Sequence, residues 1–290
     1  MQALNLEAKV TLFSSKKTLN IRGKLMDISQ PLVMGILNVT PDSFYDGGRH
    51  SSGEMMQARI ELLLEEGADI IDIGGYSSRP GASAIDQEEE QQRVLRAVDA
   101  VRSISEEVVI SIDTFRSPVA HAALDNGAHM INDISGGQLD PLMFDTVAKW
   151  KVPYVLMHMK GNPQNMTQHT NYEHLITEIS AFFVNRIAML KEKGIPDIIL
   201  DPGFGFAKTI TQNYELLRNL DYFQLLQCPL LVGLSRKSMI YKSLNCTADE
   251  ALNGTTALNT IALMNGASIL RVHDVKAAKE AIKCFRLTYP

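Results

Sequence analysis

The chain has 290 residues, of which 45% are hydrophobic and 21% are charged, and its formal net charge is −5. This length suits a single α/β barrel, and the apolar fraction is typical of a globular protein. The acidic balance excludes a general electrostatic attraction to nucleic acid or to an anionic membrane, so any bound anion must be held by a local cluster.

Eight short runs rich in β-branched residues lie along the chain, and the first of them is "LVMGILNV". Most are apolar on both faces, which is typical of parallel strands buried on both sides of a sheet. Helix-like segments separate them, and the segment at 247–266 opens with a capping-box pattern from Thr247 to Glu250. In chain order the predicted strands span 32–39, 69–75, 108–115, 130–136, 153–158, 197–203, 229–235 and 268–274.

Strand and helix alternate eight times, which predicts a (β/α)₈ TIM barrel with a parallel eight-stranded core. A doubly wound open sheet is the main alternative. The composition shows no break, so we expect one domain over residues 1–290, with the N-terminal extension 1–30 capping the barrel bottom. The sequence has no apolar run of membrane-spanning length and no signal-peptide pattern, and its three widely spaced cysteines suit the reducing cytoplasm.

Polar residues gather where the predicted strands end, and the C-terminal strand ends of such a barrel meet around one mouth. Asp113, Asn132 and Asp201 lie within or directly after strongly apolar sequence, where a charge is costly unless it is paired or hydrogen-bonded. An internal salt bridge, for example between Asp201 and Lys237, is the alternative to a functional role. The full set comprises Asn38, Tyr76, Ser77, Ser78, Arg79, Asp113, Asn132, His158, Asp201, Ser235, Arg236, Lys237, Ser238, Arg271 and His273.

These residue types suit a flat ring rich in hydrogen-bond donors and acceptors that carries a phosphate group. A carboxylate accepts two parallel N–H groups from an amino-pyrimidine edge, and Lys237 can donate to a ring carbonyl or a ring nitrogen. Arg271 and His273 are two residues apart and therefore share one face of a strand. Together with Arg79 they predict an anion pocket suited to phosphate oxygens.

The first predicted strand ends in Asn38 and continues into the glycine-bearing loop "NVTPDSFYDGG". The amide of Asn38 offers a neutral oxygen that could bind Mg²⁺, which binds phosphates with few protein ligands. A loop of this composition next to a phosphate site predicts a lid, formed by 42–48, that closes over the substrate.

Eight motifs in chain order resemble the dihydropteroate synthase family, and together they cover residues 32–275. The resemblance implies a barrel enzyme, usually a homodimer, that joins 6-hydroxymethyl-7,8-dihydropterin pyrophosphate to p-aminobenzoate. The products would be 7,8-dihydropteroate and pyrophosphate, in folate synthesis, with sulfonamides as expected competitors of p-aminobenzoate. The motifs are "MGILNVTPDSFYDGG", "GADIIDIGGYSSRPGA", "SIDTF", "INDISGG", "MHMKGNP", "DPGFGF", "GLSRKS" and "RVHDV".

The resemblance also implies a role for each site residue, and Asp113 would stabilise the positive charge that develops on the pterin. The other residues implied to act in catalysis are Lys237, Arg271 and His273. The pterin ring would be held by Asp113, Asn132, Asp201 and Lys237, with Arg271 stacked on its face. The pyrophosphate would be held by Asn38 through Mg²⁺ and by Arg79, Arg271 and His273. The p-aminobenzoate site would be formed by Phe44, Ser78, Arg79, Pro80, Phe206, Lys237 and Ser238.

Two residues depart from the pattern of the family, because Tyr76 stands where many members carry Glu and Ser78 where Thr is common. Ser78 keeps a hydroxyl, whereas Tyr76 changes both size and charge beside the second loop. Two other functions are alternatives on a pterin-binding barrel: a methyltransferase domain that acts with a corrinoid, and a non-catalytic pterin-binding protein. Neither requires the diphosphate residues Asn38, Arg79, Arg271 and His273.

Overall fold

The computed structural model describes residues 16–40, 52–77 and 85–289. Eight parallel strands form a closed barrel in which β10 pairs with both β9 and β3. The predicted (β/α)₈ barrel is therefore confirmed, and the open-sheet alternative is wrong because the sheet has no free edge. The barrel strands are β3 Leu32–Asn38, β4 Ile70–Gly74, β5 Val109–Asp113, β6 Met130–Asp133, β7 Tyr154–Met157, β8 Ile198–Asp201, β9 Leu230–Val232 and β10 Ala267–Val272.

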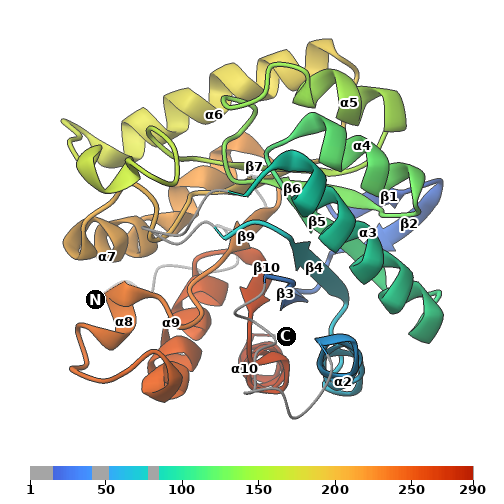
Figure 1. Ribbon diagram of the computed structural model, residues 1–290. Coiled ribbons are helices and arrows are strands. Elements are labelled where there is room, and N and C mark those ends of the chain that lie inside the picture. The colour runs from blue at the N-terminus through green and yellow to red at the C-terminus, as the bar shows by residue number, and fades with distance from the viewer. Residues whose placement is uncertain (1–15, 41–51, 78–84, 290) are drawn as a thin grey trace, which may run out of the picture.

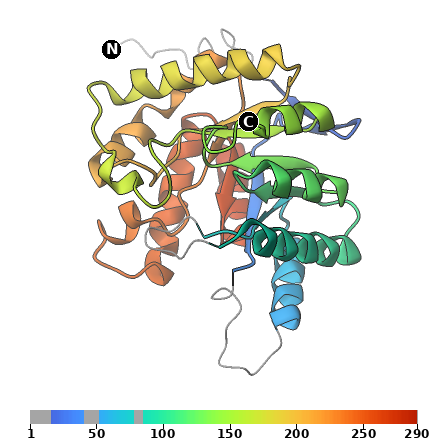
Figure 2. The same ribbon diagram turned by 45° about the horizontal axis from the view of Figure 1, so that its top comes forward.

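Helices surround the barrel on its outside (Figures 1 and 2). Thr247 and Glu250 form the predicted reciprocal cap, in which each backbone N–H donates to the side chain of the other residue, at 2.9 and 3.4 Å. Within the described ranges, no helix is both long and apolar enough to cross a membrane. The α-helices are α2 Ser52–Glu65, α3 Gln87–Ile104, α4 Ser117–Asp125, α5 Met143–Trp150, α6 Leu175–Glu192, α7 Ile210–Arg218, α8 Ser238–Tyr241, α9 Leu252–Met264 and α10 Val275–Thr288; the 3₁₀ helices are η2 Met166–Gln168, η3 Leu220–Leu226 and η4 Asp249–Ala251.

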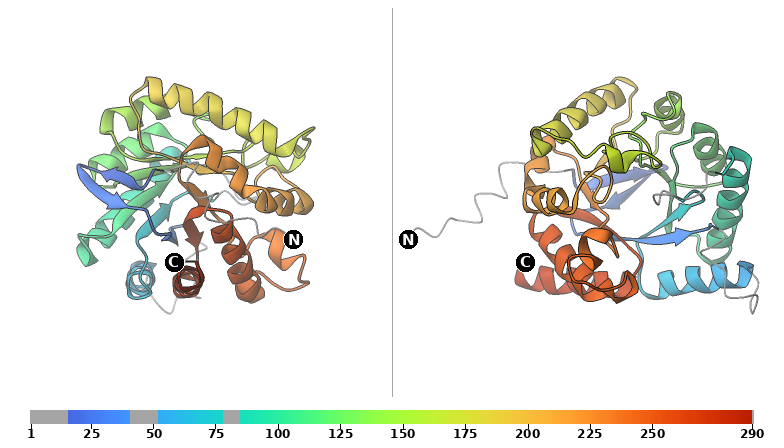
Figure 3. Two further views of the ribbon diagram at one scale, coloured as in Figure 1. Left: turned by 180° about the vertical axis from the view of Figure 1, so that it is seen from behind. Right: turned by 60° about the vertical axis from the view of Figure 1, so that its left-hand side comes forward.

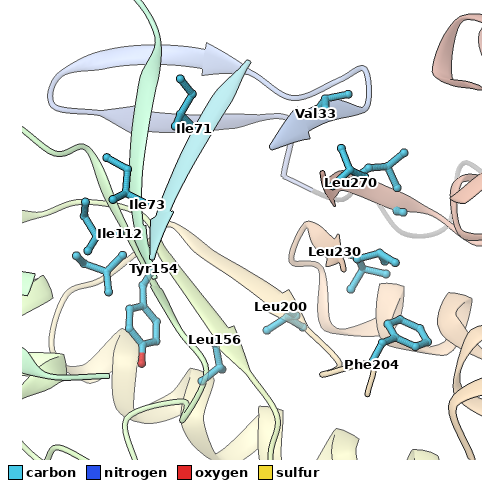
Figure 4. Packing of buried hydrophobic residues seen from close by; sticks show 14 of the residues in the cluster. Val33, Ile71, Ile73, Ile112, Tyr154, Leu156, Leu200, Phe204, Leu230 and Leu270 are labelled. Carbon is cyan, nitrogen blue, oxygen red and sulfur yellow. The ribbon is translucent and has the colours of Figure 1, made fainter. Parts of the chain in front are cut away.

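Alternate side chains of each barrel strand point to opposite sides of the sheet, as the two-residue period of a strand requires. The outward set packs under the helices and forms the larger core, in which Ile71 and Ile73 of β4 and Tyr154 and Leu156 of β7 are fully buried (Figure 4). The inward set fills the bottom of the barrel with one apolar side chain from each strand. This bottom layer comprises Met34, Ile70, Val109, Met130, Val155, Ile199, Leu231 and Ile269.

A two-stranded antiparallel hairpin precedes the barrel, formed by β1 Thr18–Ile21 and β2 Lys24–Asp27 (blue in Figure 3). Leu19 and Ile21 of β1, together with Ile28, pack in one cluster with the bottom layer. The hairpin thus covers apolar side chains that the open lower end of the barrel would expose to water.

Two residues above the bottom layer, the inward side chains of several strands become polar. This second layer includes Asp72, Ser111, Asn132, Asp201 and Arg271. The same two-residue period therefore brings an apolar floor and a polar layer together inside one barrel.

Candidate active site

The centre of the polar layer is the guanidinium group of Arg271, which lies between two carboxylates from other strands. Its Nε donates to Asp72 Oδ2 at 2.6 Å, and its Nη2 donates to Asp113 Oδ2 at 2.7 Å. The charge-assisted bonds fix the plane of the guanidinium group. Arg271 is thus oriented as part of the barrel interior rather than as a mobile surface cation.

Asp72 is a residue of this site that our sequence analysis missed. It is fully buried in β4, and its Oδ2 also accepts a hydrogen bond from Asn132 Nδ2 at 3.0 Å. The available signal was an aspartate inside the apolar run 69–75, two residues after Ile70 and therefore on the same inward face. Strand-end reasoning overlooked it because it lies in the middle of the strand.

Three buried acceptors in this layer have no hydrogen-bond partner among the residues that the structure describes: Asp72 Oδ1, Ser111 Oγ and Asn132 Oδ1. They come from the neighbouring strands β4, β5 and β6. A buried polar atom without a partner costs about 1–3 kcal/mol. A ligand with several N–H donors on one edge would satisfy them, so this polar layer suits an amino-pyrimidine ring.

Burial changes the ionisation of the carboxylates around the site. It raises the pKa of Asp113 to about 7, against the opposing effect of the Arg271 guanidinium, and Asp72 raises that pKa further. Burial also raises the pKa of Asp201, while the nearby Lys237 ammonium opposes this rise. The Asp201 Oδ1 atom accepts a hydrogen bond from the Gly203 backbone N–H at 2.8 Å.

Lys237 approaches the site from the loop after β9. Its Nζ donates to the carbonyl oxygen of Phe204 and lies 4.9 Å from the centre of the Phe206 ring. Burial lowers the pKa of Lys237 to about 8, and Asp201 opposes this change. No direct ion pair joins Asp201 and Lys237 in the described part of the chain; the internal salt bridges of this layer are those of Arg271 with Asp72 and Asp113.

His273 directly follows β10, and its Nδ1 lies 2.9 Å from Ser235 Oγ. Burial lowers the pKa of His273 to about 4, and the positive charge of Arg271 lowers it further. We therefore expect a neutral imidazole at neutral pH, which would contribute a hydrogen bond to an anion rather than a charge. Of the two strand residues expected to bind phosphate, Arg271 is then the charged one and His273 a neutral hydrogen-bonding group.

Asn38 ends β3 beside Asp113. A Cβ added to Gly74, which lies between them, would be 3.4 Å from Asn38 Oδ1 and 3.7 Å from Asp113 Cβ. Among the described residues, no group of three His, Cys, Asp or Glu side chains could hold a metal ion. The donor set at Asn38, one neutral amide oxygen at the mouth, suits a Mg²⁺ ion that takes its other ligands from phosphate and water.

The expected p-aminobenzoate residues are only partly described. Phe206 packs at the mouth against an apolar cluster that includes Ile134, Met157 and Met159, and Ser238 is the first residue of α8. Tyr76 packs edge-on against Phe115 at 5.2 Å between ring centres, and its hydroxyl accepts a hydrogen bond from Gln164 Nε2. Phe44, Ser78, Arg79, Pro80 and the lid 42–48 lie outside the described residues.

A closed parallel barrel with an Asp–Arg–Asp cluster and unpaired buried acceptors in its polar layer is typical of an enzyme that binds a polar heterocycle. The family model for pterin binding enzymes matches residues 34–273. Curated relatives named dihydropteroate synthase are 42–46% identical over 87–92% of the chain, so the chain belongs to the dihydropteroate synthase family of these enzymes. The family confirms the resemblance seen in the sequence and the predicted transferase class. It favours neither of the two alternatives, the corrinoid-dependent methyltransferase domain and the non-catalytic pterin-binding protein.

Three relatives illustrate the match. Dihydropteroate synthase of Escherichia coli (strain K12) is 45% identical over 269 residues, which are 92% of this chain and 95% of that protein. The structure of Xanthomonas albilineans dihydropteroate synthase with 4-aminobenzoic acid has a TM-score of 0.88 at 39% identity and covers 94% of this chain and 98% of its own. The Yersinia pestis enzyme in a sulfonamide drug complex has a TM-score of 0.87 at 43% identity, with 93% and 98% covered.

Proposed function

We propose that this chain catalyses the condensation of 6-hydroxymethyl-7,8-dihydropterin pyrophosphate with p-aminobenzoate to give 7,8-dihydropteroate and pyrophosphate. The observation that carries the proposal is the row of unpaired buried acceptors on β4, β5 and β6. The N–H groups of a pterin ring would satisfy Asp72 Oδ1 and Asn132 Oδ1. Asp201 and Lys237 would hold the same ring from the opposite side of the barrel, and Arg271 would lie against its face.

Loss of pyrophosphate leaves a positive charge on the methylene carbon that is delocalised into the ring. We propose that the carboxylate of Asp113 stabilises this charge, because electrostatic stabilisation is strongest in a buried site. The ion pair with Arg271 holds that carboxylate in a fixed position, so no reorganisation is needed when the charge forms. The aromatic amine then attacks the carbon, and the new C–N bond leaves a protonated nitrogen. Because this amine is weakly basic, the nitrogen loses its proton to water or to the released pyrophosphate without a strong general base.

The diphosphate group would lie near Asn38 and His273. Mg²⁺ held by Asn38 would supply positive charge to the leaving pyrophosphate. Ser235 Oγ accepts a hydrogen bond from the backbone N–H of His273 at 3.2 Å and also lies at hydrogen-bond distance from the His273 Nδ1 atom. A serine hydroxyl that donates to Nδ1 places the ring proton of His273 on Nε2, from where it can donate to a phosphate oxygen.

We propose that p-aminobenzoate binds between Phe206, Lys237 and Ser238, with Phe44, Ser78, Arg79 and Pro80 completing the site. The 4-aminobenzoic acid bound by the Xanthomonas albilineans relative supports this substrate. The sulfonamide bound by the Yersinia pestis relative supports competition by sulfonamides for the same place.

We also propose one pterin-binding domain over residues 1–290, a cytoplasmic location and a homodimer. The domain is supported by the single closed barrel and by the hairpin packed on its bottom layer. The location is supported by the three cysteines, all of which are free. The homodimer is supported by the family resemblance.

The first experiment measures pyrophosphate release from purified protein with dihydropterin pyrophosphate, with and without Mg²⁺ and p-aminobenzoate. We expect release that depends on Mg²⁺ and yields dihydropteroate when p-aminobenzoate is present. Tight pterin binding without any release would contradict the proposed function.

The pH profile of kcat/KM for the pterin substrate should be a narrow bell. The reaction needs Asp113 ionised and Lys237 protonated, so activity rises as the pH passes about 7 and falls as it passes about 8. The profile is measured between pH 5.5 and 9.5 in buffers of constant ionic strength. Lys237→Ala should keep the rise and lose the fall, and a flat wild-type profile would refute the assignment.

A further inference from the structure

The segment 203–207, between β8 and α7, has no regular secondary structure, yet side chains hold most of its backbone polar groups. Lys237 Nζ donates to the Phe204 carbonyl, and Asn213 Oδ1 accepts the Gly205 N–H at 2.6 Å. Tyr172 donates its hydroxyl to the Ala207 carbonyl at 3.1 Å. Ala207 has a φ of 49°, a left-handed conformation that costs about 1–2 kcal/mol for a residue with a side chain. Such a segment keeps its shape only while its surroundings hold it.

Asp201 Oδ1 accepts the Gly203 N–H, and two further contacts come from Lys208, a residue that the proposed reaction does not use. Its Nζ donates to the carbonyl oxygens of Gly203 at 2.9 Å and Phe206 at 3.0 Å, and it lies 3.3 Å from His158 Nδ1. Lys208 is 8% exposed. It therefore binds both ends of the turn that carries Phe204 and Phe206.

Burial of a lysine ammonium at this position costs free energy. Its charge faces Asp201, but Lys237 and Lys160 are also close enough to disfavour it, and burial lowers the pKa of Lys208 to about 7. The ammonium group donates to uncharged carbonyl oxygens, so among the described residues no ion pair at contact distance compensates the hydration that it loses on burial. Stability alone therefore gives little reason for an ammonium group here.

The two carbonyls that Lys208 binds flank the groups that place Lys237. The Phe204 carbonyl oxygen accepts a hydrogen bond from the Lys237 ammonium, and the Phe206 ring lies beside that ammonium. A Cβ at Gly205, where φ is +80°, would lie 3.1 Å from Lys237 Cδ, so only a residue without a side chain lets the turn pass this close to the lysine. Any movement of this turn would therefore move Lys237.

We propose that Lys208 is a positioning residue that holds both ends of the 203–206 turn and thereby sets the place of the Lys237 ammonium at the substrates. This inference rests on the proposed synthase function, in which Lys237 contacts the pterin and p-aminobenzoate. It assigns a role to a buried side chain that acts through another residue and need not touch either substrate.

The test is a double-mutant cycle of Lys208→Met and Lys237→Ala, with kcat and KM measured for both substrates. We expect each single change to lower kcat/KM by roughly 10- to 100-fold, because displacement of a catalytic group by about 1 Å costs on that order. We expect the double variant to be less than about threefold worse than Lys237→Ala alone, since coupled residues are not additive. The melting temperature of Lys208→Met should stay within about 4 °C of wild type.

Lys160→Met is the matched control. Lys160 contributes to the same electrostatic surroundings, but it pairs with Glu178 at 2.7 Å and donates to the Asn171 carbonyl. Within the described ranges it contacts the segment only through the Tyr172 ring, which it faces at 3.7 Å, and it gives no hydrogen bond to the turn. It should keep wild-type kcat/KM within about twofold, as for a partly exposed ion pair. If Lys208→Met does not fold, the cycle is run with Lys208→Gln, whose shorter side chain keeps N–H donors.

Two outcomes separate the possible failures. If wild-type protein forms no dihydropteroate, the proposed function is contradicted. If wild-type protein is active but Lys208→Met keeps its activity, or if the losses of the two single variants multiply in the double variant, the positioning role alone is overturned.

Discussion

Asp113→Asn is expected to lower kcat by about 100-fold or more, comparable with removal of one electrostatic group from other active sites. The substitution keeps the size of the side chain and its ability to accept from Arg271, but it removes the negative charge beside the developing cation. The KM for the pterin substrate should change much less, because an amide oxygen can still accept a hydrogen bond. Steady-state kinetics with both substrates at saturating Mg²⁺ give the two values.

The barrel of the Asp113→Asn variant should remain folded, since Arg271 keeps its bond to Asp72 at 2.6 Å. Asp145→Asn is a matched control, because Asp145 is an exposed aspartate that pairs with Lys193 on the surface. That control should be indistinguishable from wild type in turnover. An Asp113→Asn enzyme with more than a third of wild-type kcat would show that charge at this position is not used.

Asp72→Ala is expected to have the largest effect on stability, lowering the free energy of unfolding by about 3–5 kcal/mol. Asp72 is fully buried, whereas the Asp113 side chain is 17% exposed. Its removal leaves Arg271 with one carboxylate instead of two and leaves Asn132 Nδ2 without its acceptor. Urea unfolding, followed by circular dichroism, measures the change from the midpoint and slope.

Asp72→Asn is the comparison that separates charge from shape. It keeps the volume and one acceptor oxygen, so it should recover the hydrogen bond from Asn132 but not the charge opposite Arg271. We expect a loss of stability between those of wild type and Asp72→Ala. If Asp72→Ala costs less than about 1 kcal/mol, the site does not depend on this carboxylate, and Arg271 is held by Asp113 alone.

The apolar runs predicted all eight barrel strands, because a parallel strand covered on both faces must be apolar at nearly every position. The apolar pattern of the sequence indicates the helix α7 less clearly than it indicates the strands. Its N-terminus nevertheless carries a capping box between Thr209 and Gln212, with bonds of 2.8 and 3.2 Å, and that pair is a usable sequence signal. The order of the elements then follows from the order of the chain.

The sequence by itself thus determined the barrel, its floor and the strand-end residues at its mouth, because a strand's two-residue period and the apolar pattern are local properties. Only the tertiary structure decided how those residues are charged and paired. It partly buried His273, joined Arg271 to both Asp72 and Asp113, and placed the Lys208 ammonium against the carbonyl oxygens of a turn. Pairing and burial depend on side chains that are far apart in the chain, up to 199 residues for Asp72 and Arg271, so no local pattern can reveal them.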